Sequence, residues 1–167
     1  MYLKSNAKID ACAYYPGIIR EVMKVFLESD VGLVQLPCPE FLYLGLDREA
    51  IHGENTTIES EDTRVALRMN EEIAQELCHQ IVSNIIYQID EYRKHGFQIV
   101  GLVGINCSPT CGVETTWSND REHLGQGVFI KMINDELVKR QISMKMVGIK
   151  AKDSKQAVIA IKEILYS

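Results

Sequence analysis

Apolar residues recur at three- and four-residue spacing in four stretches of the chain, and this spacing predicts four amphipathic helices. Pro16 suits the first turn of the first helix because the N–H that it lacks would be unpaired there. Gly96 ends the second helix, and Gly125-Gln126-Gly127 leads into the third. Asp153 or Ser154 caps the closing helix. The expected helices cover residues 16–29, 61–95, about 128–140 and about 154–165.

Continuous apolar runs between these helices predict three short, buried strands, at residues 31–36, 98–105 and 142–149. Strands that alternate with helices favour a parallel sheet with right-handed crossovers. We therefore expect one domain over residues 1–167, with an α/β fold built as a Rossmann-like three-layer sandwich with a mainly parallel sheet. The pattern begins with a helix, so the first strand of such a sheet is missing. Residues 41–60 are expected to form an irregular, functional loop.

The composition of the chain argues against several classes of function. The chain has 167 residues, 46% of them hydrophobic and 25% charged, as in an ordinary globular domain. Its net charge of −5 argues against a general nucleic-acid binder, which needs a basic surface. No apolar run approaches the length of a membrane-spanning helix, and the first ten residues do not resemble a signal peptide. We expect a cytoplasmic protein with no membrane or nucleic-acid partner.

Five cysteines in such a chain favour metal ligands, catalytic groups or buried thiols over a disulfide framework. Cys38 and Cys111 come just after two of the predicted strands. Each lies in a loop stiffened by proline, in Pro37-Cys38-Pro39-Glu40 and in Ser108-Pro109-Thr110-Cys111-Gly112. A preset backbone favours ligand binding because less ordering is needed. The two thiols are therefore candidate ligands or nucleophiles, and the alternative is that both are merely buried.

Two polar residues accompany these thiols. Glu40 is expected at the same strand end as Cys38, where a carboxylate can act as acid or base, or can simply be a solvated loop residue. Ser108 can donate a hydrogen bond to a bound group, or can organise the turn before Pro109. The four histidines are scattered without ligand spacing and are assigned no role.

The other three cysteines carry weaker signals. Cys107 could be a further ligand, but we favour a thiol packed beside the core. Cys78 lies on the long predicted helix and is interpreted as a small hydrophobic residue. Cys12 has no mark beyond its thiol.

The two proline–cysteine motifs, in this order and followed by Gly125-Gln126-Gly127-Val128, resemble those of the 2-thiouracil desulfurase family and its relatives. The Tyr15-Pro16-Gly17 element is similar to that of one branch of desulfidases. The resemblance runs from about Leu3 to the end of the third predicted helix. It implies an α/β domain that holds a 4Fe-4S cluster through three cysteines, with one iron open to sulfur from a thiolated substrate.

The resemblance implies roles for four residues of this chain. The second and third cluster ligands of the family fall on Cys38 and Cys111, the catalytic carboxylate on Glu40 and the serine of the second motif on Ser108. An open position on the metal is the general feature of a catalytic metal site.

The first ligand of the family has no clear counterpart. In relatives it precedes a Leu-Asn-Gln-Asn-like run, which is similar to Leu3-Lys4-Ser5-Asn6, so its position falls at or before Met1. One expectation is that this cysteine and the missing strand lie upstream of Met1, or are absent from a truncated relative. The alternatives are that Cys12 or Cys107 supplies the third thiolate, or that no cluster forms.

The leading hypothesis is an iron–sulfur-dependent desulfidase that removes sulfur from a small thiolated compound similar to a thio-nucleobase. Two alternatives stay open. One is a thiol-dependent hydrolase or transferase with Cys38 or Cys111 as nucleophile. The other is a non-catalytic module that binds a metal, such as zinc, or a small ligand.

Overall fold

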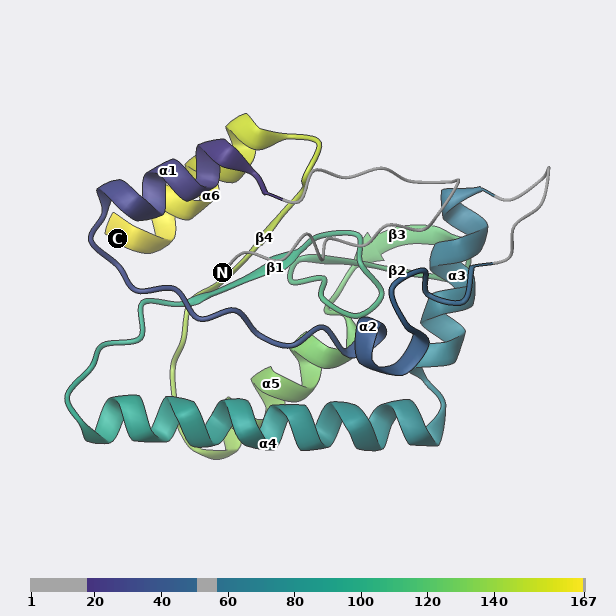
Figure 1. The fold of residues 1–167 in the computed structure, drawn as a ribbon, viewed down its shortest axis with the longest axis horizontal. Helices are drawn as coiled ribbons and strands as arrows, with labels where there is room; N and C mark the ends of the chain where they lie inside the picture. Colours follow the sequence, from purple (N-terminus) through teal and green to yellow (C-terminus); the bar gives the residue numbers. More distant parts are fainter. Residues whose placement is uncertain (1–17, 51–56, 167) are drawn as a thin grey trace.

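The computed structural model describes residues 18–50 and 57–166 of the chain. These residues form a mixed α/β fold with one parallel and one antiparallel pair of strands (Figure 1). The helices are α1 (Arg20–Glu28), α2 (Pro39–Leu44), α3 (Ile58–Met69), α4 (Glu72–Lys94), α5 (Val128–Lys139) and α6 (Ser154–Tyr166). The strands are β1 (Leu102–Ile105), β2 (Thr115–Ser118), β3 (Arg121–Leu124) and β4 (Met146–Ile149).

The parallel pair β1–β4 lies at the centre of the fold, with Leu102 paired to Met146 and Ile105 to Ile149. The chain passes through α5 between these strands, and a parallel pair needs a crossover connection of this length. Helices α1 and α6 lie on one side of the pair, and α4 and α5 lie on the other (Figure 1). The larger apolar core fills the side of α4 and α5, and the smaller one joins β4 to α1 and α6.

The antiparallel pair β2–β3 is a hairpin that the sequence did not suggest. Its turn is Asn119-Asp120, with φ of 52° and 59°. Left-handed backbone at both central positions matches the strand twist of a two-residue hairpin, and Asn and Asp tolerate it better than most residues. Little apolar–polar alternation marks these strands, since β3 reads Arg-Glu-His-Leu. The hairpin therefore had no periodic signal.

The long helix expected at residues 61–95 is two helices, α3 and α4, separated at Asn70 and Glu71. The side-chain amide of Asn70 donates to the carbonyl of Ala66 at 2.7 Å, and the backbone of Glu71 is extended, with ψ of 147°. Asparagine competes with the backbone for helical hydrogen bonds, which favours a helix end. Helix α3 also begins earlier than expected, at a capping box in which Thr57 and Ser60 exchange hydrogen bonds.

Other elements expected from the sequence also have different boundaries in the structure. Residues 31–36 run without a helix or a strand partner among the described residues, so the expected strand there is wrong. Only the last four residues of each of the other two expected strands pair, as β1 and β4. The loop expected at 41–60 contains most of α2 and the start of α3. Helices α5 and α6 are confirmed, and Asp153 caps α6 by accepting the N–H of Gln156 at 3.0 Å.

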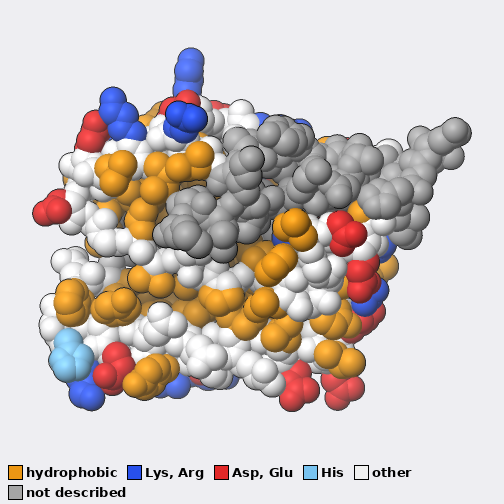
Figure 2. Space-filling view, viewed as in Figure 1, with side chains coloured by type: hydrophobic (Ala, Val, Ile, Leu, Met, Phe, Trp, Pro, Cys, Tyr) orange, Lys and Arg blue, Asp and Glu red, His pale blue; other side chains and the backbone are white. Residues whose placement is uncertain are grey.

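Apolar side chains form a band across the face seen in Figure 2, between the α1 side and the α4 side of the molecule. Leu33 and Val34 of the extended segment and Phe97 after α4 are all about half exposed or more. The part of the chain that the structure describes contains no helix that is both long and apolar enough to cross a membrane.

Candidate functional site

Ser108 stabilises the loop after β1 through hydrogen bonds within that loop. The hydroxyl oxygen of Ser108 accepts the backbone N–H groups of Thr110 at 3.2 Å and of Cys111 at 2.9 Å. The carbonyl of Ser108 accepts the N–H of Gly112 at 3.1 Å. Ser108 thus organises the turn before Pro109, which is one of the two roles that the sequence left open for it. The thiol of Cys111 is carried by a rigid backbone.

This loop is fixed to the start of α5. The N–H of Val128 donates to the carbonyl of Pro109 at 3.0 Å, and the N–H of Phe129 donates to the carbonyl of Thr110 at 3.1 Å. A Cβ added at Gly127 would lie 2.5 Å from the carbonyl carbon of Thr110, so only glycine allows this approach. The glycine motif before α5 is therefore part of the site's framework.

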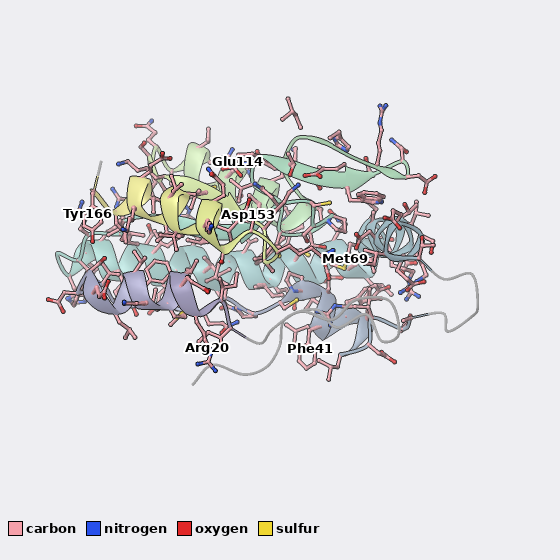
Figure 3. The ribbon with its side chains drawn as sticks, turned by 90° about the horizontal axis from the view of Figure 1, so that it is seen from above. Arg20, Phe41, Met69, Glu114, Asp153 and Tyr166 are labelled. Carbon is pink, nitrogen blue, oxygen red and sulfur yellow. The ribbon has the colours of Figure 1, made fainter. Side chains whose placement is uncertain are left out.

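Asn106 ties the same loop to the hairpin and to β4. Its side-chain oxygen accepts the N–H groups of Val113, Glu114 and Thr115 at 3.1–3.3 Å. Its side-chain amide donates to Glu114 at 2.7 Å, and Glu114 also accepts the N–H of Gly148 at 3.0 Å. Figure 3 labels Glu114, which lies on the hairpin side of the molecule.

The first motif forms the beginning of α2. Cys38 is the N-cap residue, with φ of −88° and ψ of 113°, and Pro39 occupies the first helical position, where proline is favoured. The second proline of the motif thus starts a helix, where the sequence suggested a break. Glu40 follows in the first turn and is only 8% exposed. Figure 3 shows this helix, marked by Phe41, in the half of the molecule that also contains α3.

A buried arginine joins the residues of this motif. Arg48 is 1% exposed, and its Nε–H donates to Oε2 of Glu40 at 3.1 Å. Its Nη2 lies 3.5 Å from Sγ of Cys38, within hydrogen-bond range for sulfur. Its Nη1 donates to the carbonyls of Gly45 at 2.8 Å and Leu46 at 2.9 Å, at the end of α2. One guanidinium therefore holds both ends of α2.

The two motifs meet at Glu40 and Ser108. Oγ of Ser108 lies 3.5 Å from Oε1 of Glu40, at the outer limit of a hydrogen bond, across 68 residues of sequence. The structure thus brings together Cys38, Glu40, Ser108 and Cys111, four residues that the sequence singled out.

Burial and mutual repulsion raise the pKa values of the thiols here. The pKa of Cys111 is raised well above its ordinary value, chiefly by burial and then by neighbouring Glu40, Cys38 and Cys78. Burial and then Glu40 raise the pKa of Cys38, against a lowering influence of Arg48. Burial, Glu40 and Cys38 raise the pKa of Cys78 to about 11. These thiols are protonated near neutral pH unless a bound cation displaces their protons.

Cys78 is buried in the larger core, which agrees with its interpretation as a small hydrophobic residue. Cys78 nevertheless contributes to the raised pKa of Cys111, so a third thiol, carried by α4, lies near the site. No sequence pattern indicates this proximity, because it depends on how α4 packs against the two loops.

Cys107 belongs to a different group of side chains. Burial and then Glu122 raise its pKa to about 11. Glu122 in turn accepts the hydroxyl of Thr115 at 2.6 Å and pairs with Lys150 at 2.7 Å. Cys107 itself has a left-handed backbone, with φ of 72°. Its thiol therefore lies with the hairpin, and Cys12 lies outside the described residues.

Arg48 and Asp62 are the residues of this site that sequence reasoning missed. Arg48 is the one Lys or Arg between Lys24 and Arg64. This isolation points to a role only once a buried anion is known to lie beside the arginine. Asp62 on α3 is half-buried, and its pKa is raised to about 7 by burial and by Glu40, Glu59 and Glu61. Its neighbours Glu59 and Glu61 on α3 are also acidic, and no sequence pattern singled Asp62 out from them.

Among the described residues, no group of three or more His, Cys, Asp or Glu side chains is arranged to hold a metal ion. Cys38 and Cys111, with a guanidinium beside one of them, are chemically suited to bind an iron–sulfur cluster, which proteins hold by cysteine thiolates. The described donors fit such a group in kind and would supply two of its ligands. A third would have to come from elsewhere, and the alternatives that the sequence leaves open within the chain are Cys12 and Cys107.

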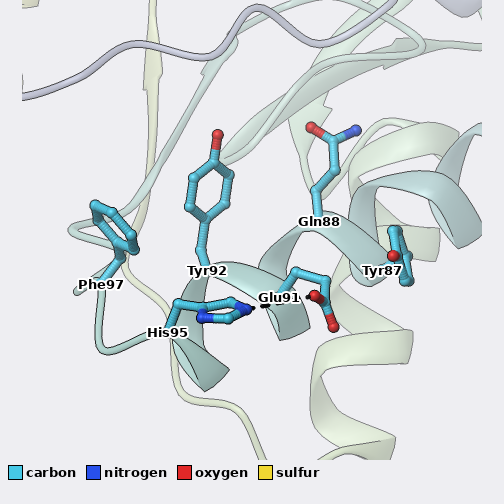
Figure 4. Close-up of a pocket in the computed structure, with 6 residues that line it drawn as sticks. All are labelled: Tyr87, Gln88, Glu91, Tyr92, His95 and Phe97. Atoms are coloured by element: carbon cyan, nitrogen blue, oxygen red, sulfur yellow. Dashed lines mark ion pairs between the residues drawn. The ribbon is translucent and has the colours of Figure 1, made fainter.

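A separate shallow cavity of about 260 Å³ lies at the end of α4 (Figure 4). Tyr87, Tyr92 and Phe97 line it together with the polar residues Gln88, Glu91 and His95, and Tyr92 and Phe97 pack edge to face at 5.6 Å. None of the cysteines contributes to it. The thiols with raised pKa values and the contact between the two motifs lie elsewhere, so the candidate site is the one at Cys38 and Cys111.

Comparison with known proteins gives one relative. The chain is 33% identical over 111 residues to uncharacterized protein MJ0003 of Methanocaldococcus jannaschii. The match covers 66% of this chain and 62% of that protein, so the chain spans less than two thirds of the relative's length. No family model and no solved structure matches the chain.

Proposed function

We propose that the chain is an iron–sulfur-dependent desulfidase with a Rossmann-like three-layer α/β fold. The observation that carries the proposal is the contact between Ser108 and Glu40, because it unites two motifs that lie far apart in the sequence. The resemblance of these motifs to the 2-thiouracil desulfurase family supports it. So does the position of the parallel pair between two helical groups.

The substrate class is a small molecule with a thiocarbonyl group, such as a thiolated nucleobase. The net reaction is hydrolysis, in which the carbon exchanges sulfur for oxygen from water and sulfide is released. No electrons are gained or lost in this exchange. When bound by Cys38, Cys111 and a third thiolate, the cluster would supply an electron-pair acceptor for the leaving sulfur.

The chain's own residues would handle the water and the proton. Glu40 would accept a proton from the attacking water through Oε1, the oxygen that faces Ser108. The hydroxyl of Ser108 would donate to Glu40 or to the substrate, while its oxygen continues to hold the N–H of Cys111. Because Glu40 is held by Arg48 at the start of α2 and Ser108 by hydrogen bonds within its loop, they would need little reorganisation.

The raised pKa values of Cys38 and Cys111 weigh against a thiol nucleophile, which needs a lowered pKa. They are compatible with ligation, since a bound metal displaces the proton of a coordinating thiol, which is released to solvent.

The proposal is tested by anaerobic reconstitution of the full chain with iron and sulfide. We expect bound iron and the broad visible absorption of a cluster, and a loss of both in Cys38→Ala and Cys111→Ala. A colourless wild-type protein without iron would refute the iron–sulfur proposal.

A further inference from the structure

We propose that Arg48 is a positioning residue of this site, whose guanidinium orients Glu40 toward Ser108 and fixes Cys38 at the start of α2. The inference rests on the proposed function for its catalytic consequence. Its geometric part stands on the contacts of Arg48 alone.

One of the donors of Arg48 orients Glu40. Its Nε–H holds Oε2 of Glu40, which leaves Oε1 as the oxygen that faces Ser108. Without this contact the carboxylate could rotate about its side-chain torsions, and either oxygen could turn away. The guanidinium donates to Glu40 while its other nitrogens contact Cys38 and the carbonyls of Gly45 and Leu46, and the ammonium of lysine has too few donors, in the wrong geometry, to replace it.

The same guanidinium also sets the backbone that carries Cys38. Its Nη2 lies beside Sγ of Cys38, at the first end of α2, and its Nη1 holds the carbonyls of Gly45 and Leu46 at the other end. Helix α2 has only six residues, and isolated helices of that length are unstable in water. Arg48 therefore replaces the stability that a longer helix would provide.

Arg48 is itself anchored to α3. Its carbonyl accepts Nη2 of Arg64 at 2.7 Å, and Arg64 pairs with Glu61 at 2.6 Å. Its backbone has a left-handed φ of 60°, which costs energy for a residue other than glycine. A buried charge in such a conformation persists because the surrounding contacts hold it. Through the contacts of Arg64 with Arg48 and of Arg48 with Glu40, the position of Glu40 depends on that of α3.

The test compares Arg48→Lys and Arg48→Met with the remote control Arg140→Gln, which removes an exposed arginine paired with Asp90. Hydrogen exchange of the α2 amides is measured without reference to activity. We expect exchange at least about tenfold faster in both Arg48 variants and unchanged in the control, because α2 loses its clamp. Unchanged α2 exchange in Arg48→Met would overturn the proposal whatever the protein catalyses.

The second measurement uses reconstituted protein and a thiolated nucleobase as probe, with activity expressed per cluster. We expect kcat of Arg48→Lys to fall about 10- to 100-fold while KM changes less than about threefold, as for a misplaced catalytic group. In a Glu40→Gln background, Arg48→Lys should cost little more, because Arg48 acts through Glu40.

The outcomes separate the two claims. Independent, multiplicative losses from Arg48→Lys and Glu40→Gln would overturn the positioning role, as would full activity per cluster in Arg48→Lys. If the wild type takes up no iron and releases no sulfide, the proposed function fails, and hydrogen exchange alone decides whether Arg48 clamps α2.

Discussion

Asp62 on α3 should destabilise the folded protein at neutral and higher pH, and removing its charge should relieve this. Burial and then Glu40 raise the pKa of Asp62 from its ordinary value of 3.8 to about 7. The folded state therefore binds this proton more tightly than the unfolded state does. Stability falls as the pH rises from about 4 to about 7, and the full penalty is present above that range. Asp62→Asn should remove the penalty.

The magnitude follows from the same values. A rise from 3.8 to about 7 corresponds to at most about 4 kcal/mol, at about 1.4 kcal/mol for each pH unit. Asp62 is only half-buried, so solvent screens the repulsion. We expect Asp62→Asn to raise the free energy of unfolding by about 1–2 kcal/mol at about pH 8, and Tm by roughly 2–8 °C for a chain of this size.

The assay is urea unfolding of wild type and Asp62→Asn at about pH 4, 6 and 8. The gain should be near zero at the lowest pH and grow with pH. Asp135→Asn is the matched control, because Asp135 is an exposed aspartate on α5 paired only at the surface with Lys131. It should change stability by less than about 0.5 kcal/mol at every pH. A gain that is absent at about pH 8, or equal at all three values, would refute the reasoning.

Two further substitutions test the framework of the site. Gly127→Ala should lower the free energy of unfolding by about 1–3 kcal/mol, because its Cβ would meet the backbone of Thr110 at 2.5 Å. Gly32→Ala has no atom within 4 Å of the added carbon and should be nearly neutral, so equal losses by urea unfolding would contradict the close approach. Cys78→Ala should cost on the order of 1 kcal/mol and leave iron binding intact, since its thiol packs in the core. Loss of iron from Cys78→Ala as complete as from Cys38→Ala would instead make Cys78 a ligand.

The strongest periodic signals in the sequence predicted real helices. Helices α5 and α6 have apolar faces at helical spacing, and their ends are marked by Gly127 and Asp153. The stripe of α3 and α4 was equally clear, but periodicity alone could not reveal the break. At the break the side-chain amides of Asn70 and Gln75 donate to the backbone carbonyls of Ala66 and Met69.

The strands were harder to predict because strand formation needs a partner. Residues 31–36 have the apolar content of a strand but no strand partner among the described residues. β2 and β3 lack apolar alternation and are joined by a turn whose geometry depends on Asn119 and Asp120.

The candidate site was predictable in part, because its cysteines stand in proline motifs that fix the backbone. Cys38, Glu40, Ser108 and Cys111 could be named from these motifs alone. Arg48 could not, since its importance comes from burial against Glu40, which only the folded arrangement creates. Cys78 was correctly placed in the core, but its closeness to the site depends on the packing of α4.

The most direct test of the central claim is to measure both products formed from a thiolated nucleobase by the reconstituted protein in isotopically labelled water. The account predicts one sulfide for each oxo-nucleobase, with the new oxygen taken from water. Glu40→Gln should keep its iron and lose most of this activity. Sulfide release without labelled oxo-product, or full activity in Glu40→Gln, would contradict the account.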